Sequence, residues 1–200
     1  MVDEEDDTRR RLLDNARAHY LEVGGSAHFS LREVARRSGV SPAAVYRHFE
    51  GKDFIFRTLI TEGFRIFHVY LMQSLAEPTP LERLRAAGRQ YLAFAGEHWQ
   101  HYSVIFMTRH TTKPNHDADN AATFQFLVDR VRECVEAKVL REDDSSALAA
   151  AIWAHVHGLV SLRLTGHLRG VGSDEAFAKF YAASVDDFLH ALAPRKRERT

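Results

Sequence analysis

The stretch that decides the fold runs from Ser30 to Lys52 and reads SLREVARRSGVSPAAVYRHFEGK. Its first residues, Ser30 to Glu33, have the pattern of a capping box, in which the serine oxygen and the glutamate satisfy amides at a helix start. Gly39 then supplies a turn, and Ser41-Pro42 supplies a second cap with proline at the first helical position. Two short helices joined by a three-residue turn form a helix-turn-helix, whose second helix can enter the DNA major groove.

Helical periodicity also dominates the rest of the chain. Apolar residues recur at steps of three and four, and alternating strand-like runs are hard to find, so we predict an all-α fold of about nine helices. A helix is expected to end at Gly24-Gly25, and a long one follows the helix-turn-helix. The expected later elements are helices over 52–75, 80–98, 102–107, 120–139, 145–165 and 174–192, an exposed loop over 111–119 and a frayed tail over 195–199.

Composition places the protein among folded, soluble ones. Of 200 residues, 45% are hydrophobic and 27% are charged, which argues against wholesale disorder. Cys134 is the single cysteine, so no internal disulfide can form, as suits a reducing compartment. No apolar run approaches the roughly 20 residues of a membrane span, and five acids among the first seven residues are unlike a secretory signal. We therefore expect a cytoplasmic protein with no membrane partner.

Charge is distributed unevenly along a chain that is neutral overall. The 27 basic and 27 acidic residues cancel. Residues 8–60, however, carry ten bases against five acids, an excess of five positive charges. A modest positive field of this kind suits a DNA-facing module attached to an electrically neutral body.

The decisive stretch resembles the DNA-binding domain of tetracycline-repressor (TetR) type regulators. The most specific part of the match is Tyr-x-His-Phe-x-x-Lys, from Tyr46 to Lys52. The resemblance implies a two-part chain, with a three-helix DNA-binding domain over 8–64 and a helical-bundle domain for effector binding and dimerisation over 65–192. A weaker resemblance, at Trp153-Ala-His-Val-His-Gly158, is to the Trp-His-Gly (WHG) subgroup of TetR C-terminal domains.

Roles within the helix-turn-helix follow from spacing and from the resemblance together. Val45 and Phe49 are four residues apart and should bury, which turns the opposite face of the second helix outward. Small residues on that face let the backbone approach the bases. The resemblance implies phosphate contacts for the tyrosine, histidine and lysine of the motif, a base contact for Arg32, and a base or phosphate contact for Arg47. The predicted DNA-binding residues are Ser30, Arg32, Ser41, Pro42, Ala43, Tyr46, Arg47, His48 and Lys52.

Aromatic residues on the later helices are candidates for an effector pocket, because the matching helices in the family surround a cavity. The predicted ligand-binding residues are Phe94, Trp99, Tyr102, Phe106, Phe124, Trp153 and His157. For Trp153 and Gly158 the alternative is an ordinary packed helix face. For His157 a core or interface role and a ligand role are both open.

The last two long helices carry a strip of small residues and a run of aromatics, which favours dimerisation; the alternative is that they pack only within one protomer. The strip is Ala147, Ala150, Ala151, Ala154 and Gly158, and the aromatics are Phe177, Phe180, Tyr181 and Phe188.

The predicted function is a ligand-responsive DNA-binding regulator, most simply a homodimeric repressor released from a pseudo-palindromic double-stranded operator by a small molecule. The alternatives are a ligand-independent or activating relative and, with less support, a metal sensor or an enzyme. Histidine pairs such as His98 and His101 lack further ligands, and no catalytic or phosphate-binding motif is present. We therefore expect no metal, no cofactor and no catalysis.

Overall fold

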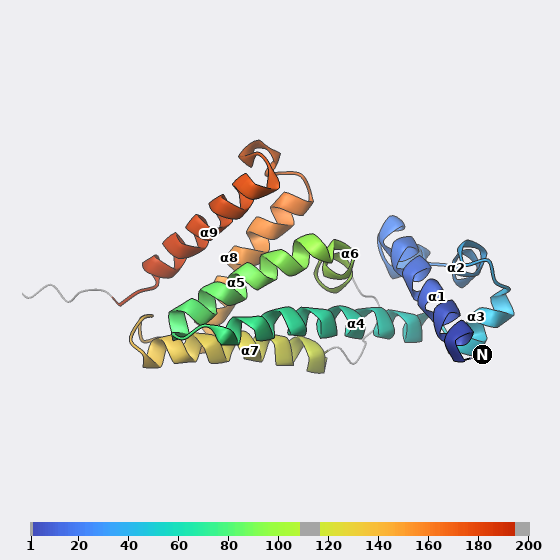
Figure 1. The fold of residues 1–200 in the computed structure, drawn as a ribbon, viewed down its shortest axis with the longest axis horizontal. Coiled ribbons are helices and arrows are strands. Elements are labelled where there is room, and N and C mark those ends of the chain that lie inside the picture. Colours follow the sequence, from blue (N-terminus) through green and yellow to red (C-terminus); the bar gives the residue numbers. More distant parts are fainter. Residues whose placement is uncertain (1, 109–116, 195–200) are drawn as a thin grey trace, which may run out of the picture. The chain divides into compact units, whose positions relative to one another are not determined.

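The computed structural model describes residues 2–108 and 117–194. Within these ranges every regular element is a helix, and nine are α-helices, which confirms the predicted all-α fold (Figure 1). The predicted loop over 111–119, apart from 117–119, and the predicted tail over 195–199 lie outside the described residues.

The described residues form two compact units. The first contains those of 1–66 and 98–120, and the second those of 67–97 and 121–200. The elements of the first unit are α1 (Val2–Glu22), η1 (Ser26–His28), α2 (Leu31–Arg37), α3 (Pro42–His48), the first part of α4 (Lys52–Gln73), α6 (Trp99–Tyr102) and the π-helix η3 (Ser103–Met107).

An aromatic cluster forms the core of the first unit. Tyr20, Phe29 and Phe56 are each 4% exposed or less, and the ring of Phe56 lies 4.9 Å from Tyr20 and 4.8 Å from Phe29. Helix α1 ends where expected, because Gly24 and Gly25 have φ of 72° and 121°. The helix begins at Val2, so the acidic residues from Glu4 to Asp7 are helical as well. Negative side chains complement the positive end of the helix dipole there.

Segment 98–108 packs against α4 at a glycine. A Cβ on Gly63 would lie 2.8 Å from Cγ2 of Ile105, so the two segments approach too closely for a larger residue. Phe64 and Phe106 meet edge-on at 6.0 Å beside this contact. The helix predicted over 102–107 is a four-residue α6 followed by a π-helix.

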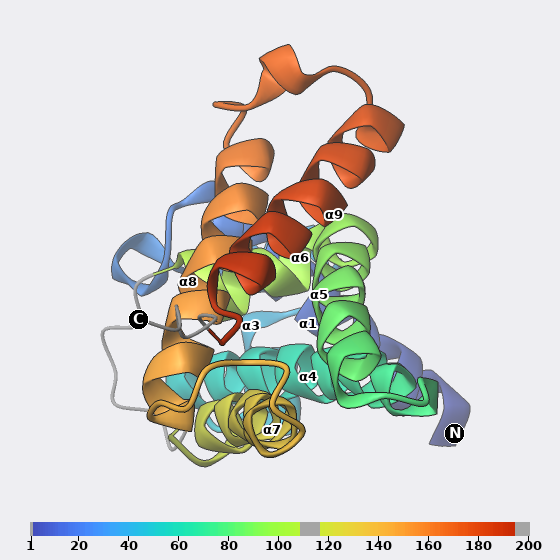
Figure 2. The same cartoon turned by 90° about the vertical axis from the view of Figure 1, so that its left-hand side faces the viewer.

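The second unit is built on three mutually packed helices, α5, α8 and α9, which Figure 2 shows together. Its elements are the end of α4, η2 (Ser74–Ala76), α5 (Pro80–Glu97), most of α7 (Asp117–Glu136), α8 (Ser145–Leu164), η4 (Arg169–Val171) and α9 (Asp174–Ala191). The Tyr181 hydroxyl donates to the Gly88 carbonyl at 2.9 Å and so ties α9 to α5.

Caps explain where these helices begin and end. Thr79 and Glu82 form a capping box, as their Thr-x-x-Glu spacing indicates: the Glu82 amide donates to Thr79 Oγ1 at 3.3 Å and the Thr79 amide donates to Glu82 Oε2 at 3.2 Å. Asp144 caps α8 by accepting the Ser146 amide at 2.9 Å. Helix α7 ends at Glu136, before the expected residue 139, because Lys138 adopts φ of 58° and closes the helix end.

Helix α8 is apolar around much of its circumference. It is 20 residues long and apolar enough to cross a membrane by length and composition, contrary to the expectation that no apolar run approaches that length, and 28% of its most apolar window is buried. A core helix of a soluble protein passes the same test of length and composition. A largely uncovered apolar helix in a single chain needs another surface to pack against.

Candidate nucleic-acid interface

The helix-turn-helix is held together by the apolar sides of α2 and α3. Val34 and Val45 are fully buried and Ala35 is 1% exposed. Between the helices Gly39 has φ of 68°, and the Val40 amide returns to the Ala35 carbonyl at 3.1 Å. This turn fixes the angle between the two helices and leaves one side of α3 uncovered.

The start of α3 is formed as the sequence predicts. Ser41 Oγ accepts a hydrogen bond from the Ala44 amide at 3.2 Å, and Pro42 occupies the first helical position. Ser41, Pro42 and Ala43 are exposed, and Tyr46 is 61% exposed. The small residues and the tyrosine thus lie on the outward face, opposite the buried Val45.

The predicted capping box at Ser30 is wrong. Helix α2 does begin at Leu31, but the Ser30 side chain makes no cap hydrogen bond. Glu33 instead accepts from Arg36 at 2.7 and 2.8 Å and from Arg37 at 2.7 Å. Two guanidinium groups offer charge-assisted bonds that outcompete one backbone amide, and they lower the pKa of Glu33 to about 2.

Cationic side chains on the outward side divide into two groups. Arg36 and Arg37 are engaged by Glu33, and Arg37 also meets Glu22 at 2.7 Å. Arg32, Arg47 and Lys52 are exposed and form no ion pair with another residue in 2–108 or 117–194, while His48 is half-buried. The second group keeps its positive charge available to an anionic partner.

The residues after α3 connect this helix to α4 through packed side chains. Phe49 is 1% exposed, the Arg9 guanidinium lies 5.4 Å from its ring centroid, and the ring of Phe54 is 6.2 Å away. These contacts hold the C-terminal end of α3 between the start of α1 and the start of α4.

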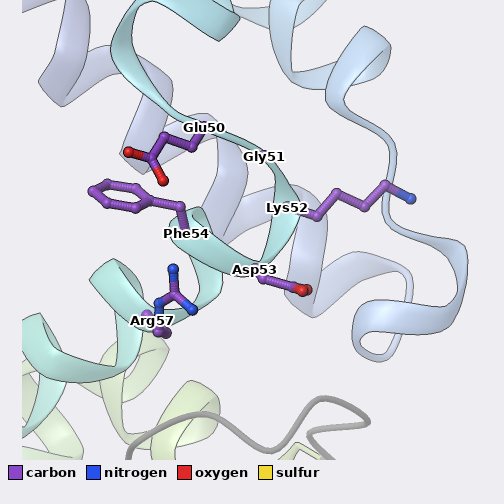
Figure 3. Close-up of a pocket in the computed structure, with 6 residues that line it drawn as sticks. All are labelled: Glu50, Gly51, Lys52, Asp53, Phe54 and Arg57. Carbon is purple, nitrogen blue, oxygen red and sulfur yellow. The ribbon is translucent and has the colours of Figure 1, made fainter.

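An open depression of about 320 Å³ lies at the start of α4. Figure 3 shows Glu50, Phe54 and Arg57 gathered on one side of this turn, whereas the Lys52 side chain extends away from them. The depression carries two acids and is largely polar, so it does not suit an apolar effector. Lys52 itself points outward from the first residue of α4, where helix amides add to its attraction for a phosphate.

Two polar contacts in this unit were not singled out from the sequence. His19 accepts the Ser30 amide at Nε2, 3.2 Å away. Arg17, 6% exposed, bridges Asp14 at 3.0 Å and Glu62 at 2.7 Å, and His101 Nε2 lies 3.8 Å from Glu62 Oε2. His101 and Arg17 hold the pKa of Glu62 at about 2. No local motif marks the contact of His19 with Ser30 or those of Arg17 and His101 with Glu62, because these partners lie far apart in sequence.

The predicted effector residues are divided between the units. In the second unit Tyr91 and His157 share a 2.9 Å hydrogen bond, and the Trp153 ring lies 5.8 Å from His157 and 6.2 Å from Phe124. Phe94 is fully buried in the same unit, stacked on Phe67 at 4.9 Å.

The other three predicted effector residues belong to the first unit. Tyr102 is fully buried and packs on Phe106 at 5.2 Å, while Trp99 is 51% exposed. The structure therefore brings Phe124, Trp153 and His157 together. Tyr91 joins them, although the sequence analysis did not single it out.

The fold and the exposed cationic side of a helix-turn-helix define a class, the DNA-binding regulators. Residues 12–59 match the family described as "Bacterial regulatory proteins, tetR family", and residues 84–188 match "Tetracyclin repressor-like, C-terminal domain". The C-terminal match alone covers more than half of the chain. The protein therefore belongs to the TetR family of DNA-binding transcriptional regulators, a family of non-enzymes.

Solved structures share this fold over nearly the whole chain. A protein of unknown function from Rhodococcus sp. RHA1 is 28% identical, with a TM-score of 0.76 over 94% of this chain and 96% of that one. AibR, solved with isovaleryl coenzyme A and operator DNA, is 19% identical, with a TM-score of 0.71 over 94% of this chain and 100% of that one. The ketosteroid transcriptional regulator KstR2 of Mycobacterium tuberculosis is 18% identical, with a TM-score of 0.69 over 94% of this chain and 95% of that one. At these last two identities the similarity concerns the fold alone.

Proposed function

We propose that the protein is a homodimeric transcriptional repressor that leaves a pseudo-palindromic operator when a small molecule binds. In this proposal residues 8–64 bind DNA in the cytoplasm and residues 65–192 provide dimerisation and effector binding. The observation that carries it is the outward side of α3, where Ser41, Pro42, Ala43 and Tyr46 are exposed above a buried Val45. A helix presented in this way fits the major groove.

The contacts with DNA are assigned by chemistry. Arg32 pairs with guanine, and Pro42 and Ala43 approach a thymine methyl. Tyr46, His48 and Lys52 bind phosphates, which supply affinity without sequence preference. The Ser30 hydroxyl, which caps no helix, and Ser41 complete the set, and Arg47 reaches a base or a phosphate.

Dimerisation through α8 and α9 is supported by what one protomer leaves uncovered. Ala147, Ala150, Ala151 and Ala154 are exposed along α8, and Phe180 on α9 is 40% exposed. Phe177 and Tyr181, from the same aromatic run, are buried within the protomer and belong to its own core. A second copy would cover the exposed set by a twofold arrangement of the same surface.

The effector site is assigned to Phe124, Trp153 and His157 together with Tyr91. Burial lowers the pKa of His157 below its ordinary value of 6.5, so the imidazole is neutral at pH 7. This surrounding suits a mainly apolar molecule with one polar group. AibR, solved in complex with isovaleryl coenzyme A, is an example of this fold with a ligand that carries an apolar acyl group. The Trp-His-Gly segment at 153–158 supports placing the C-terminal domain in the WHG subgroup.

The test is operator binding with and without effector candidates. Protein and DNA from the region next to its own gene are mixed, the protected sequence is mapped, and uncharged apolar compounds and acyl-coenzyme A compounds are added. Release of an inverted-repeat operator by one compound is the expected result. Binding that no compound changes would favour a ligand-independent regulator, and activation of transcription by the bound protein would remove the repressor assignment.

A metal sensor is a poorer alternative. Among the described residues no three histidine, cysteine or carboxylate side chains come together as a metal site would require. Metal analysis of the purified protein checks this directly.

A further inference from the structure

His19 holds the start of α2 by a side chain that lies on another helix. It is 5% exposed on α1, and its ring lies 5.3 Å from that of Phe29. Its Nε2 accepts the backbone amide of Ser30 at 3.2 Å. An imidazole that accepts through Nε2 must be neutral and carry its proton on Nδ1.

This arrangement leaves the other ring nitrogen of His19, which carries the proton, without a hydrogen bond. Nδ1 of His19 is buried and has no hydrogen-bond partner within the described residues. A buried donor without a partner is unfavourable, and a phenylalanine here would avoid that penalty. Compared with phenylalanine, the imidazole provides an acceptor for the Ser30 amide.

The Ser30 amide, which His19 holds, lies at the start of helix α2. Ser30 is the N-cap residue of α2, and its own side chain gives no cap hydrogen bond. Helix α2 is only seven residues long, and Arg32 stands in its first turn. A shift of Ser30 would therefore carry with it two of the residues assigned to the DNA contact.

We propose that His19 is a positioning residue for DNA binding: its neutral ring fixes Ser30 and Arg32, and protonation releases them, so that operator affinity falls as the solution becomes acidic. The proposal rests on the DNA-binding role assigned to α2 and α3 above.

The charged groups around the ring agree with this direction. Burial, followed by the positive charge of Arg37 on α2, lowers the pKa of His19 below its ordinary value of 6.5, while Glu33 on α2 and Glu22 on α1 oppose the shift. His28, on η1, is exposed. The ring is therefore neutral at pH 7. As the pH falls below 6.5 and through this lowered pKa, protonation turns Nε2 into a donor. Nε2 then faces another donor, the Ser30 amide, and the contact is lost.

Acid has the opposite effect on a histidine that faces DNA. His48 is assigned to a phosphate, so its protonation would add positive charge and strengthen binding. The sign of the pH response in a variant altered only at His19 therefore separates the two histidines.

The experiment compares two substitutions of His19 that separate its role as a hydrogen-bond acceptor from its ability to take up a proton. His19→Gln keeps an acceptor but does not titrate, and His19→Phe keeps a ring against Phe29 but has no acceptor. Operator affinity of the full-length protein is measured by fluorescence anisotropy from pH 8 to 5.5 at constant salt. Circular dichroism at each pH confirms that the helices remain folded. Ser30→Ala is the matched control, because it removes a hydroxyl and leaves the amide in place.

The expected result is a difference between pH profiles. Relative to His19→Gln, the wild type should lose affinity between pH 7 and 5.5, by up to about tenfold per pH unit for each protomer that takes up one proton. His19→Phe should bind weakly at pH 7.5 already. Ser30→Ala should follow the wild-type profile, whatever its absolute affinity.

Two failures are distinguishable. Parallel profiles for the wild type and His19→Gln would overturn the role of His19 and leave the DNA-binding assignment intact. A wild type that binds no operator at any pH would overturn the proposed function and this inference with it. The protection factor of the Ser30 amide against hydrogen exchange, measured without DNA and corrected for the intrinsic exchange rate at each pH, should fall in acid for the wild type and not for His19→Gln; equal protection factors would also refute the contact.

Discussion

Replacing Lys52 with alanine should reduce the salt dependence of DNA binding without weakening the fold. Lys52 is exposed, forms no ion pair among the described residues and extends away from Glu50 and Phe54 (Figure 3). It is the first residue of α4, where a positive charge opposes the helix dipole. Its removal should therefore leave stability unchanged or raise it by about 0.3–1 kcal/mol.

The magnitude follows from counterion release. Each lost phosphate contact lowers the slope of log affinity against log salt by about 0.9, so a dimer that loses two should lose about 1.8. Between about 50 and 200 mM salt, operator affinity should then fall roughly tenfold less for the variant than for the wild type. The loss at low salt should be similar on operator and random duplexes, because phosphates carry no sequence information.

The assay is a fluorescence-anisotropy salt titration on both duplexes. Lys179→Ala is the matched control, since Lys179 is exposed on α9 and pairs with Glu175 at 2.7 Å. It removes an equal charge far along the chain and should leave the slope unchanged. A wild-type slope in the Lys52 variant, with its helices intact, would refute the phosphate role.

Three further predictions concern specificity, stability and assembly. Arg32→Ala should cost ~1–3 kcal/mol per site on the operator and relax one symmetric base preference; equal losses on random DNA would make Arg32 a backbone contact. Glu62→Gln takes a partner from the buried Arg17 and should lower the unfolding free energy by about 1–3 kcal/mol at pH 7, as measured by urea denaturation. Because the pKa of Glu62 is lowered from 4.5 to about 2, this stabilisation is present above pH 4.5 and is lost as the pH falls towards 2, so a gap that persists at pH 2 would contradict the ion-pair explanation. Phe180→Asp places a charge in the proposed dimer surface, and sedimentation should then show a 22.8 kDa monomer at micromolar concentration where the wild type is twice that mass; an unchanged dimer would place the interface elsewhere.

Local signals predicted much of the fold correctly. The serine cap before Pro42 and the Thr79–Glu82 capping box use partners within three residues, and both form as the sequence indicates. The capping box at Ser30 has the same Ser/Thr-x-x-Glu pattern but does not form. The difference is that Arg36 and Arg37 follow Glu33 at helical spacing and take its carboxylate. A motif is reliable only when no stronger partner competes for its side chains.

Other features had no signal in the sequence. The left-handed residue that ends α7 is Lys138, where glycine or asparagine would be expected. The contacts of Arg17 with Glu62 and of His19 with Ser30 join residues 45 and 11 positions apart. For the effector, the proximity of Tyr91 to His157 depends on how α5 packs on α8, which periodicity does not specify. Buried polar pairs of this kind come from tertiary packing rather than from local pattern.

The packing of segment 98–108 bears on how an effector would release DNA. By sequence this segment lies inside the C-terminal family match over 84–188, yet it packs with α1 and α4 in the same unit as the helix-turn-helix. The close approach at Gly63 leaves no room for a larger side chain between this segment and α4. A ligand changes operator occupancy only by the difference in its affinity for the two arrangements, and reversal of a 99:1 population needs a ratio of about 10⁴. Under the proposed function the effector must therefore contact groups that differ between the DNA-bound and released forms, and tight binding alone would not suffice.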